Sequence, residues 1–509
     1  MNNYQIDWLA KWAKYTPGKL FLREYFRNIE FSFKDFNIRA SSLALYLKNE
    51  LELKKGDRLA VYSKNCAEYV LLLLASIKAG VILVPLNFRL TPRELDVLIH
   101  DSGPSVLFYD AEYENEFKKL TSTSEISTIL KLEKVTAFLT GESDGKDEFT
   151  ADEFTFDDPV MILYTAGTTG VSKGVIINHS MLFWNAVNTT LRLDLTGNDH
   201  TQSFAPFFHT GGWNVLFTPF LFNGASHTLL NSFDAGLILE LMEKEKTTIM
   251  FGVPTMLQMI SDNPKWNETD LSTLRYAIVG GAPMPVPLID KWHQKGIFIR
   301  QGYGLTEVGP NCFSLHQDDA YRKKGSIGFP NFYIETKVVR DDGSEANDNE
   351  TGELWLRSPV VTPGYFNKPN ETENSITDGW FHTGDMVLRD EEGYFYVVDR
   401  KKNMFISGGE NVYPAEIERF LYAHGSFKEV AVIGVADSKW GETGKAFLVF
   451  KDGDSISIEE IKKYCLDGLA KYKIPKYFEI LETLPKNDAG KIDKLKLNEL
   501  HNQQINQLN

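Results

Sequence analysis

Between residues 58 and 110, short apolar runs alternate with segments of helical character. The runs are rich in β-branched residues and apolar on both faces, which is typical of strands buried in a parallel sheet. Helices that separate such strands normally cover the faces of the sheet. The alternation resumes farther along the chain. Predicted strands lie at 59–62, 81–84, 106–109, 248–251, 276–279 and 297–299, and predicted helices at 68–78 and 91–100.

Beyond about residue 335 the pattern changes to short strand-like runs joined by turn-rich stretches. The sequences DDGS at 341–344 and DEEG at 390–393 are typical of turns between antiparallel strands. A domain boundary is predicted after residue 399.

The segment that follows has the pattern of a small α+β domain. Pro414 opens a predicted helix, and Ser457 with Glu460 has the spacing of a capping box for a second one. Strands are expected near 430–435, 445–450 and 477–482. The polar tail, 501–509, is predicted to be disordered.

The predicted fold class is therefore α/β. A large N-terminal domain, 1–399, has layered, mostly parallel sheets with helices and an antiparallel part, and a small α+β domain spans 400–509. The length of 509 residues agrees, because single cores stop growing near roughly 250–300 residues. A hydrophobic share of 43% with 24% charged residues is ordinary for a globular protein.

Charge and cysteine content narrow the class of protein. A net charge of −15 argues against nucleic acid as a partner, because such binding needs a concentrated basic surface. The three cysteines form no C-x-x-C pair, which suits a reducing compartment. The longest apolar run, 69–86, contains Lys78 and Gly80 and fits a helix and strand better than a membrane span. We expect a cytoplasmic protein without an integral membrane span.

The stretch YTAGTTGVSKGV at 164–175 follows an apolar run and has the composition of a phosphate-binding loop. It matches neither common template: Ser172 stands before Lys173 where a Walker A loop needs glycine, and the Rossmann glycine spacing fails as well. Glycines, hydroxyls and one lysine still offer donors for phosphate oxygens. Composition alone leaves a phosphate cradle and a flexible surface loop equally open.

The rest of the chain favours the cradle, since a series of motifs resembles the adenylate-forming acyl-CoA synthetase family, in the order of that family. Each motif alone is weak, but together they span nearly the whole chain. They are LYTAGTTGVSKG at 163–174, FFHTGG at 207–212, GGAP at 280–283, GYGLTE at 302–307, TGD at 383–385, VDRKK at 398–402, SGGENVYP at 407–414 and PKNDAGKI at 485–492.

The resemblance implies a reaction and its substrates. Such enzymes join a carboxylic acid to the α-phosphate of ATP, release pyrophosphate, and let coenzyme A displace AMP. Both steps build negative charge on oxygen atoms, which fixed donors, cations and Mg²⁺ stabilise. By resemblance, Thr165, Thr168 and Lys173 contact the β- and γ-phosphates, and Glu307 is the carboxylate for magnesium.

The nucleotide contacts are carried over in the same way. Tyr303 would stack on adenine, beside Gly281 and Ala282, and Thr306 would donate to the α-phosphate. Asp385 resembles the aspartate that accepts hydrogen bonds from both ribose hydroxyls. Arg400 matches a second ribose contact, with an ion pair at the domain junction as the alternative.

The small domain resembles the mobile domain of the family. Lys491 matches the catalytic lysine whose ammonium bridges the carboxylate and the α-phosphate. Lys402 matches the hinge, and Gly408 and Gly409 match the wall of the coenzyme A tunnel after rotation. Plant coumarate ligases carry a lysine where this chain has Ile406, so that lysine's role is not transferred.

The acyl pocket is expected at 209–215, 252–256, Gly280 and 308–313, a set that includes Val308. These segments contain neither Lys nor Arg, which favours an uncharged tail. His209 is either a gate between the ATP and pantetheine sites or a buried histidine, and Trp213 either shortens the pocket or packs in the core. The segment also lacks the aspartate that amino-acid-activating relatives use for the substrate ammonium.

We therefore expect an AMP-forming acid–CoA ligase that acts on medium- or long-chain fatty acids. The alternatives are a 2-succinylbenzoate–CoA ligase, an acyl-AMP ligase that transfers to a carrier protein, and a catalytically silent nucleotide-binding module. The missing pocket cation counts against the second carboxylate of 2-succinylbenzoate. The oligomeric state is left open, with a homodimer as one option.

Overall fold

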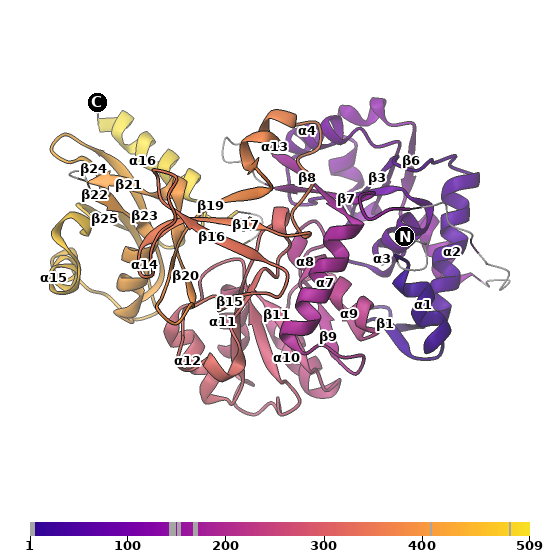
Figure 1. Cartoon of the computed structure of the whole chain (residues 1–509), viewed down its shortest axis with the longest axis horizontal. Helices are drawn as coiled ribbons and strands as arrows, with labels where there is room; N and C mark the ends of the chain where they lie inside the picture. The colour runs from indigo at the N-terminus through magenta and orange to yellow at the C-terminus, as the bar shows by residue number, and fades with distance from the viewer. Residues whose placement is uncertain are drawn as a thin grey trace.

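In the computed structural model, residues 6–141, 149, 154–165, 172–407, 410–487 and 490–508 are described. Figure 1 shows the N-terminal half on the right, a second α/β unit at the bottom, and the C-terminal segment at the upper left. Mixed sheets and helices build the large N-terminal part, which confirms the predicted fold class.

The first sheet has the strand order β6-β5-β3-β4-β7-β8 and is parallel except for the pair β7 and β8. Helix α4 begins where the sequence caps it: Thr91 and Glu94 form a capping box, and Pro92 is the first helical residue. The strands are β3 Arg58–Tyr62, β4 Ile82–Leu86, β5 Val106–Tyr109, β6 Thr128–Lys131, β7 Pro159–Thr165 and β8 Lys173–Asn178. The helices around it include α2 Phe33–Asn49, α3 Ala67–Ala79, α4 Pro92–Ser102, α5 Glu114–Phe117 and α6 Glu133–Thr140.

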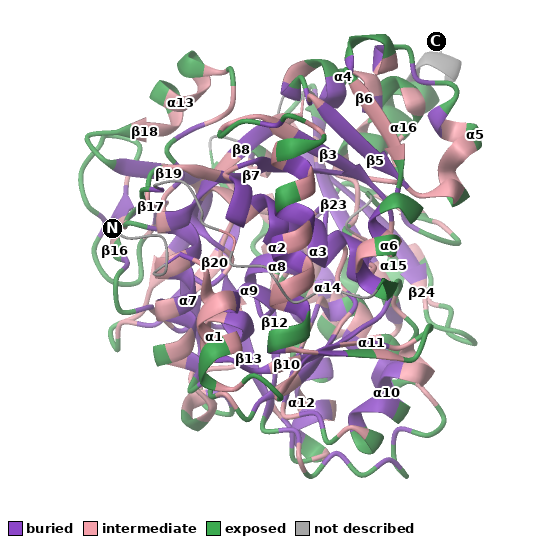
Figure 2. Ribbon diagram, turned by 90° about the vertical axis from the view of Figure 1, so that its right-hand side faces the viewer, coloured by how far each residue is buried: buried purple, intermediate pink, exposed green. Residues whose placement is uncertain are grey.

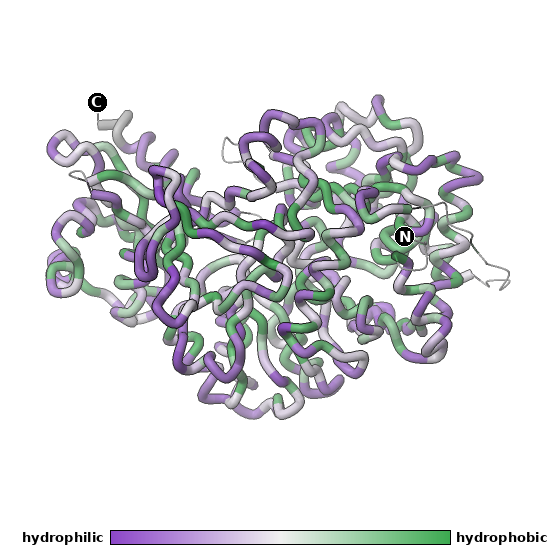
Figure 3. Tube along the Cα trace, viewed as in Figure 1, coloured by the Kyte–Doolittle hydropathy of each residue, from purple (hydrophilic) through white to green (hydrophobic). Residues whose placement is uncertain are grey.

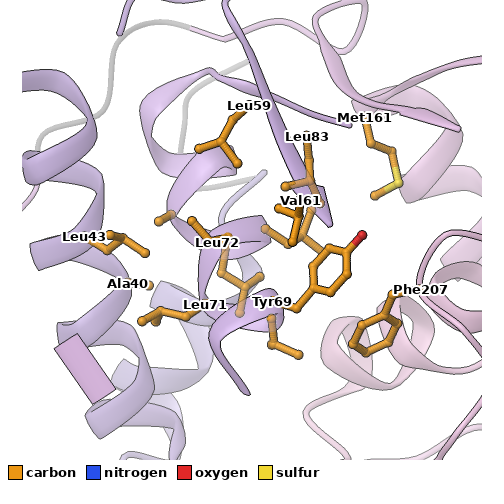
Figure 4. Close-up of a cluster of buried hydrophobic side chains, with 14 of the residues drawn as sticks. Ala40, Leu43, Leu59, Val61, Tyr69, Leu71, Leu72, Leu83, Met161 and Phe207 are labelled. Carbon is orange, nitrogen blue, oxygen red and sulfur yellow. The ribbon is translucent and has the colours of Figure 1, made fainter. Parts of the chain in front are cut away.

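Apolar burial holds α2 and α3 against this sheet. Tyr69, Leu72, Val61 and Leu83 lie together with Phe207 in one core (Figure 4). Green, apolar stretches of the chain concentrate in such interior segments in Figure 3, and buried residues line the centre of Figure 2. None of the helices in the described ranges is both long and apolar enough to cross a bilayer.

A second sheet has the strand order β11-β12-β13-β14-β15. Its first three strands are parallel, as predicted, and the last two run antiparallel. Helices α10, α11 and α12 pack on one face, while the end of α7 and helix α9 pack on the other. The strands are β11 Ile249–Gly252, β12 Tyr276–Val279, β13 Phe298–Tyr303, β14 Phe313–Ser314 and β15 Phe329–Pro330. The helices are α7 His179–Leu193, α8 Thr210–Asn214, α9 Phe217–Asn223, α10 Ala235–Lys244, α11 Pro254–Ser261 and α12 Val286–Gln294.

A small sheet of order β2-β1-β10-β9 joins the N-terminal segment to the middle of the chain, with α1 Trp8–Tyr15 beside it. It consists of β1 Leu20–Glu24, β2 Ile29–Ser32, β9 His200–Ser203 and β10 Ser226–Leu229.

The turn-rich region beyond residue 335 forms the predicted antiparallel sheet. Gly343 and Gly393 have φ of 84° and 86° in its turns, a conformation that favours glycine. The strands are β16 Glu335–Val339, β17 Thr351–Arg357, β18 Ile376–Thr377, β19 Trp380–Arg389 and β20 Phe395–Arg400, and α13 Pro369–Ser375 precedes β18.

The C-terminal segment has its own sheet, β22-β21-β24-β23, with β25 parallel to β24. Its apolar clusters contain residues from this segment alone, in agreement with a separate domain, although the boundary at residue 399 stays a prediction. The strands are β21 Phe405–Ser407, β22 Glu410–Val412, β23 Phe427–Asp437, β24 Gly441–Phe450 and β25 Tyr477–Ile480. The helices are α14 Pro414–Ala423, α15 Ile458–Gly468 and α16 Lys494–Leu508.

The predicted disorder of the tail is wrong, because α16 continues to Leu508. Asp493 accepts hydrogen bonds from the backbone N–H groups of Leu495 and Lys496 and so supports the first turn. Leu497 is fully buried against the sheet, and Gln504 accepts a hydrogen bond from Lys445 at 2.8 Å. The contacts that hold α16 come from single residues spaced along it, and the polar composition of the tail does not predict them.

The side chain of Asp399 connects β20 to the first helix of the C-terminal segment. It is 6% exposed and accepts hydrogen bonds from the backbone N–H of Ala415 at 2.7 Å and from Asn403 at 3.0 Å. Asp399 therefore caps α14 from a distance.

We predict that Asp399→Ala lowers the free energy of unfolding by about 1–2 kcal/mol, because the N–H groups of Ala415, Asn403 and Arg400 lose their acceptor. Hydrogen exchange of the amides at 414–423 should become faster. Ser457→Ala, which removes the cap of α15, is the matched control. Equal exchange at 414–423 in both variants would contradict this role of Asp399.

Candidate active site

The carboxylate of Asp385 lies at the centre of the candidate site. It is 3% exposed and accepts a hydrogen bond from the Tyr303 hydroxyl at 2.5 Å, while Arg400 Nε lies 2.6 Å from its other oxygen. The pairing of β19 with β20 places Asp385 directly opposite Arg400. Burial raises the pKa of Asp385, and the Arg400 guanidinium opposes that shift.

These contacts bear on two predicted roles. Tyr303 is 9% exposed, and its hydroxyl is committed to Asp385, so only its ring remains for adenine. Each carboxylate oxygen has two acceptor sites, so Asp385 can still receive ribose hydroxyls. Arg400 forms an ion pair, the alternative named above, with Asp385, and its ribose contact stays a prediction.

The side chain of Lys491 reaches this site from the C-terminal segment. A Cβ built on Gly281, which follows β12 with φ of 80°, would lie 3.7 Å from Lys491 Nζ and 3.6 Å from Val253 Cγ1. The residue as a whole is exposed, but its ammonium lies deep enough that burial lowers its pKa. Arg400 adds to the shift and Asp385 opposes it. Predicted residues from two distant parts of the chain thus meet here.

A second group of predicted residues gathers around Tyr365. The Tyr365 hydroxyl donates to Glu307 Oε1 at 3.0 Å, and Lys173 Nζ lies 5.1 Å from the centre of the Tyr365 ring. Lys173 also forms an ion pair with Glu371 on α13. Burial raises the pKa of Glu307, and the bond from Tyr365 opposes this rise.

Sequence reasoning missed Tyr365 and Glu371. Tyr365 follows Gly364 in the link between β17 and α13, and the predicted motifs do not include that link. Its backbone N–H donates to Thr372 at 2.9 Å, which fixes the link against α13. The sequence TPGY at 362–365 was the available signal.

Of the predicted phosphate loop, 164–175, the structure describes only the two ends, 164–165 and 172–175. Thr165 and Lys173 are paired across β7 and β8, and Thr165 Oγ1 lies 3.5 Å from the Lys173 carbonyl oxygen. Thr168 lies outside the described residues. Thr306 is the first residue of a 3₁₀ turn, Thr306–Val308, that also carries Glu307.

Two of the predicted acyl-pocket residues, Gly211 and Gly280, lie beside the Phe251 ring of the second sheet. The Phe251 ring lies 3.4 Å from a Cβ built on Gly211 and 3.9 Å from one built on Gly280. Val308 is buried. Trp213 is fully buried and stacks on Phe207 at 3.7 Å, so it packs in the core, and any effect on pocket length stays a prediction.

His209 lies close to both the acyl face and Lys491. Burial, helped by the positive charges of Lys491 and Arg89, lowers its pKa to about 4. The imidazole is therefore neutral near pH 7. Its buried Nε2 has no hydrogen-bond partner among the described residues. A neutral, unpartnered imidazole is compatible with the predicted gate.

The hinge and tunnel predictions remain untested. Lys402 lies in a 3₁₀ turn, Lys401–Asn403, directly after β20, and burial of its ammonium lowers its pKa. Gly408 and Gly409 lie outside the described residues. Ala282 is half-buried beside Gly281.

This geometry defines a class of site: cations and hydroxyl donors from distant parts of the chain surround two carboxylates, Asp385 and Glu307. Comparison with known proteins agrees with it. The model of the AMP-binding enzyme family matches residues 9–366, and that of the AMP-binding enzyme C-terminal domain matches 416–491. The chain belongs to the AMP-binding enzyme family, in its branch of AMP-forming acyl-CoA ligases, whose substrates include ATP and coenzyme A.

Individual relatives cover nearly the whole chain. A feruloyl-CoA synthase of Amycolatopsis sp is 37% identical over 96% of this chain and 97% of its own. The long-chain-fatty-acid–CoA ligase FadD13 of Mycobacterium tuberculosis is 35% identical over 97% and 98%. The o-succinylbenzoate coenzyme A synthetase of Bacillus subtilis, in complex with ATP and magnesium, is 31% identical over 96% and 98%, with a TM-score of 0.85.

The ion pair of Lys173 with Glu371 generates a prediction. Lys173 must leave Glu371 to meet a phosphate, so Glu371→Gln should bind ATP more tightly by roughly two- to fivefold, the range expected for a half-exposed pair. Isothermal titration with ATP measures the change. Glu373→Gln, on the exposed side of α13, is the control and should leave affinity unaltered. Weaker or unchanged binding by Glu371→Gln would exclude this competition.

Proposed function

We propose that this chain is an AMP-forming ligase that joins an uncharged carboxylic acid to coenzyme A through an acyl-adenylate. The observation that carries the proposal is the position of the Lys491 ammonium, beside the Gly281 backbone and within electrostatic reach of Asp385 and Arg400. A cytoplasmic location belongs to the same proposal.

In the first half-reaction a carboxylate oxygen attacks the α-phosphorus, and pyrophosphate leaves. Lys491 would hold the attacking carboxylate and the α-phosphate together. At about 4 Å and an effective dielectric constant near 20, one such charge pair contributes on the order of 4 kcal/mol. Lys173 and the hydroxyls of Thr165 and Thr168 would receive the departing pyrophosphate.

The residues around Glu307 fit a magnesium ion. The carboxylate is a hard oxygen ligand, its second oxygen is free of the Tyr365 bond, and Lys173 stands nearby for the phosphates. When bound with ATP, magnesium would neutralise charge on the phosphate oxygens. Among the described residues no cluster of three or more His, Cys, Asp and Glu side chains could cage a metal. Bound magnesium would take its other ligands from water and from the nucleotide.

In the second half-reaction the thiol of coenzyme A attacks the acyl carbonyl, and AMP leaves. The ammonium of Lys491 fills the side of the site that serves adenylation. We therefore include the predicted rotation at Lys402 in the proposal, with Gly408 and Gly409 lining the route of the thiol.

The acid itself has two candidates. The expectation of a medium- or long-chain fatty acid is supported by the apolar side chains of the second sheet and by the relative FadD13. An aromatic acid is supported by the feruloyl-CoA synthase relative and by the Phe251 ring, which lies beside Gly211 and Gly280 of the predicted pocket segments.

A panel of acids tests the function. Pyrophosphate release should occur with ATP and at least one uncharged acid among octanoate, palmitate, benzoate and cinnamate. Adding coenzyme A should then give the thioester. Release without thioester formation would favour transfer to a carrier protein, and no release from any acid, 2-succinylbenzoate included, would contradict the proposal.

Lys491→Ala should lower the rate of adenylation roughly 10²-fold or more, because the developing charge loses its fixed cation. Thioester formation from supplied acyl-AMP should survive, since the thiol does not need this ammonium. Single-turnover assays of each half-reaction measure the split. Lys486→Ala, on the same loop but paired with Glu429, is the control. Equal loss of both half-reactions would refute the division of labour.

A further inference from the structure

Asp101 lies beside the predicted phosphate loop but belongs to none of the motifs. It is the next-to-last residue of α4, and its side chain is 16% exposed. A carboxylate in the last turn of a helix faces the negative end of the helix dipole, so helix stability does not favour it there. Sequence reasoning missed this residue, because the stretch HDSG at 100–103 lies outside the motifs that carry the resemblance.

One oxygen of this carboxylate holds Tyr164, the first residue of the predicted loop. The Tyr164 hydroxyl donates to Asp101 Oδ2 at 2.7 Å. Burial raises the pKa of Tyr164, and the bond to the carboxylate raises it further, so the hydroxyl keeps its proton. Tyr164 lies opposite Gly174 in the pairing of β7 with β8. A Cβ built on Gly174 would lie 3.2 Å from Tyr164 Cζ, so the ring lies tightly against this glycine.

The other oxygen faces the link between β17 and α13. Lys368 Nζ lies 3.4 Å from Asp101 Oδ1, and the Asn367 side chain donates to the Asp101 carbonyl oxygen at 3.2 Å. The same link pairs with β8, since the Phe366 N–H donates to the Gly174 carbonyl oxygen at 2.7 Å. Asp101 therefore contacts both of the segments that flank the start of β8.

The start of β8 carries Lys173, and the link carries Tyr365. Lys173 Nζ lies 5.1 Å from the centre of the Tyr365 ring, and the Tyr365 hydroxyl donates to Glu307. A shift of Tyr164 or of the link would therefore move the backbone on either side of Lys173. A displacement of about 1 Å at a group that meets the substrate is enough to lower a rate by roughly 10²-fold.

A cavity borders this side of the loop. Its volume is about 440 Å³, and its wall includes Asp101, Tyr164, Ser172 and Lys368. Side chains that border open space have packing partners on one side only, so their polar contacts matter more for their position. The contacts of Asp101 with Tyr164 and Lys368 are of this kind.

We propose that Asp101 is a positioning residue that orients Lys173 toward the β- and γ-phosphates of ATP, through Tyr164 and through the link that carries Tyr365. The inference rests on the proposed ligase function and on the proposed phosphate contacts of Lys173. It concerns only the phosphates that leave as pyrophosphate. AMP lacks them, so the binding of AMP does not depend on Asp101.

A comparison of ATP with AMP tests the assignment. Asp101→Ala should raise the Kd for ATP roughly three- to thirtyfold, the range of a coupling carried through packed neighbours, and leave that for AMP within about twofold. Isothermal titration measures both constants. Their ratio on one preparation is independent of the folded fraction, so a destabilised variant still gives an answer. Equal loss of affinity for both nucleotides, or no loss for either, would overturn the proposal.

Two further variants test the route through Tyr164. Tyr164→Phe keeps the ring against Gly174 but loses the hydroxyl, so it should weaken ATP in the same direction. Combined with Asp101→Ala, it should cost less than the sum of the two single changes, because both remove one contact. Asp101→Asn keeps an acceptor for the hydroxyl and should restore part of the affinity for ATP. Additive losses in the double variant would overturn the proposed route.

Asp96→Ala is the matched control. Asp96 lies on the same helix and on the wall of the same cavity, but it accepts hydrogen bonds from the N–H groups and hydroxyls of Thr121 and Ser122. Its loss should destabilise the fold and leave the ratio of the two Kd values unaltered. A ratio changed as much as in Asp101→Ala would assign the effect to the helix as a whole and overturn the role of Asp101.

The proposed function and this inference fail in different ways. Release of pyrophosphate by the wild-type enzyme, with an unaltered ratio in Asp101→Ala, preserves the ligase and rejects the role of Asp101. Absence of release with every acid rejects the ligase, and the role of Asp101 falls with it.

Discussion

The approach of the Lys491 ammonium to the Gly281 backbone is the constraint on which the candidate site depends. The lysine belongs to the C-terminal segment and the glycine to the loop after β12, more than 200 positions earlier. Their meeting requires the C-terminal segment to lie over the large N-terminal part. Gly281 suits that meeting because its φ of 80° disfavours a side chain.

Charge explains the surroundings of this contact. Asp385 is buried, and the cost of burying its charge is offset because Tyr303 donates to one carboxylate oxygen and Arg400 pairs with the other. The same principle appears around Glu307, where Tyr365 donates to the carboxylate and lies beneath Lys173. Each carboxylate thus has a tyrosine hydroxyl and a cation close by. Such fixed donors can stabilise developing negative charge without reorganising, which is what adenylation demands.

Much of the fold was predictable because apolar periodicity marks buried strands directly. The strands β3, β4, β5, β11 and β12 lie where the runs of β-branched residues predict them, and the capping boxes of α4 and α15 begin their helices. The motif residues Tyr303, Asp385, Arg400 and Lys491 also converge as the resemblance implies. Their convergence could not be derived from local pattern, since it depends on packing between distant segments.

What the sequence did not reveal depends on register and side-chain reach. Glu371 meets Lys173 from a helix almost 200 residues away, and nothing in either segment announces the pair. The tail helix α16 is held by Leu497 and a few polar contacts, which composition does not distinguish from a disordered tail.

An isotope-transfer experiment tests the central claim, acyl-adenylate formation, most directly. The enzyme is incubated with ATP, coenzyme A and an accepted acid whose carboxylate carries ¹⁸O, and the products are analysed by mass spectrometry. Attack of the carboxylate on the α-phosphorus predicts one ¹⁸O atom in AMP and unlabelled pyrophosphate. Unlabelled AMP, or label in inorganic phosphate with release of ADP, would contradict the account.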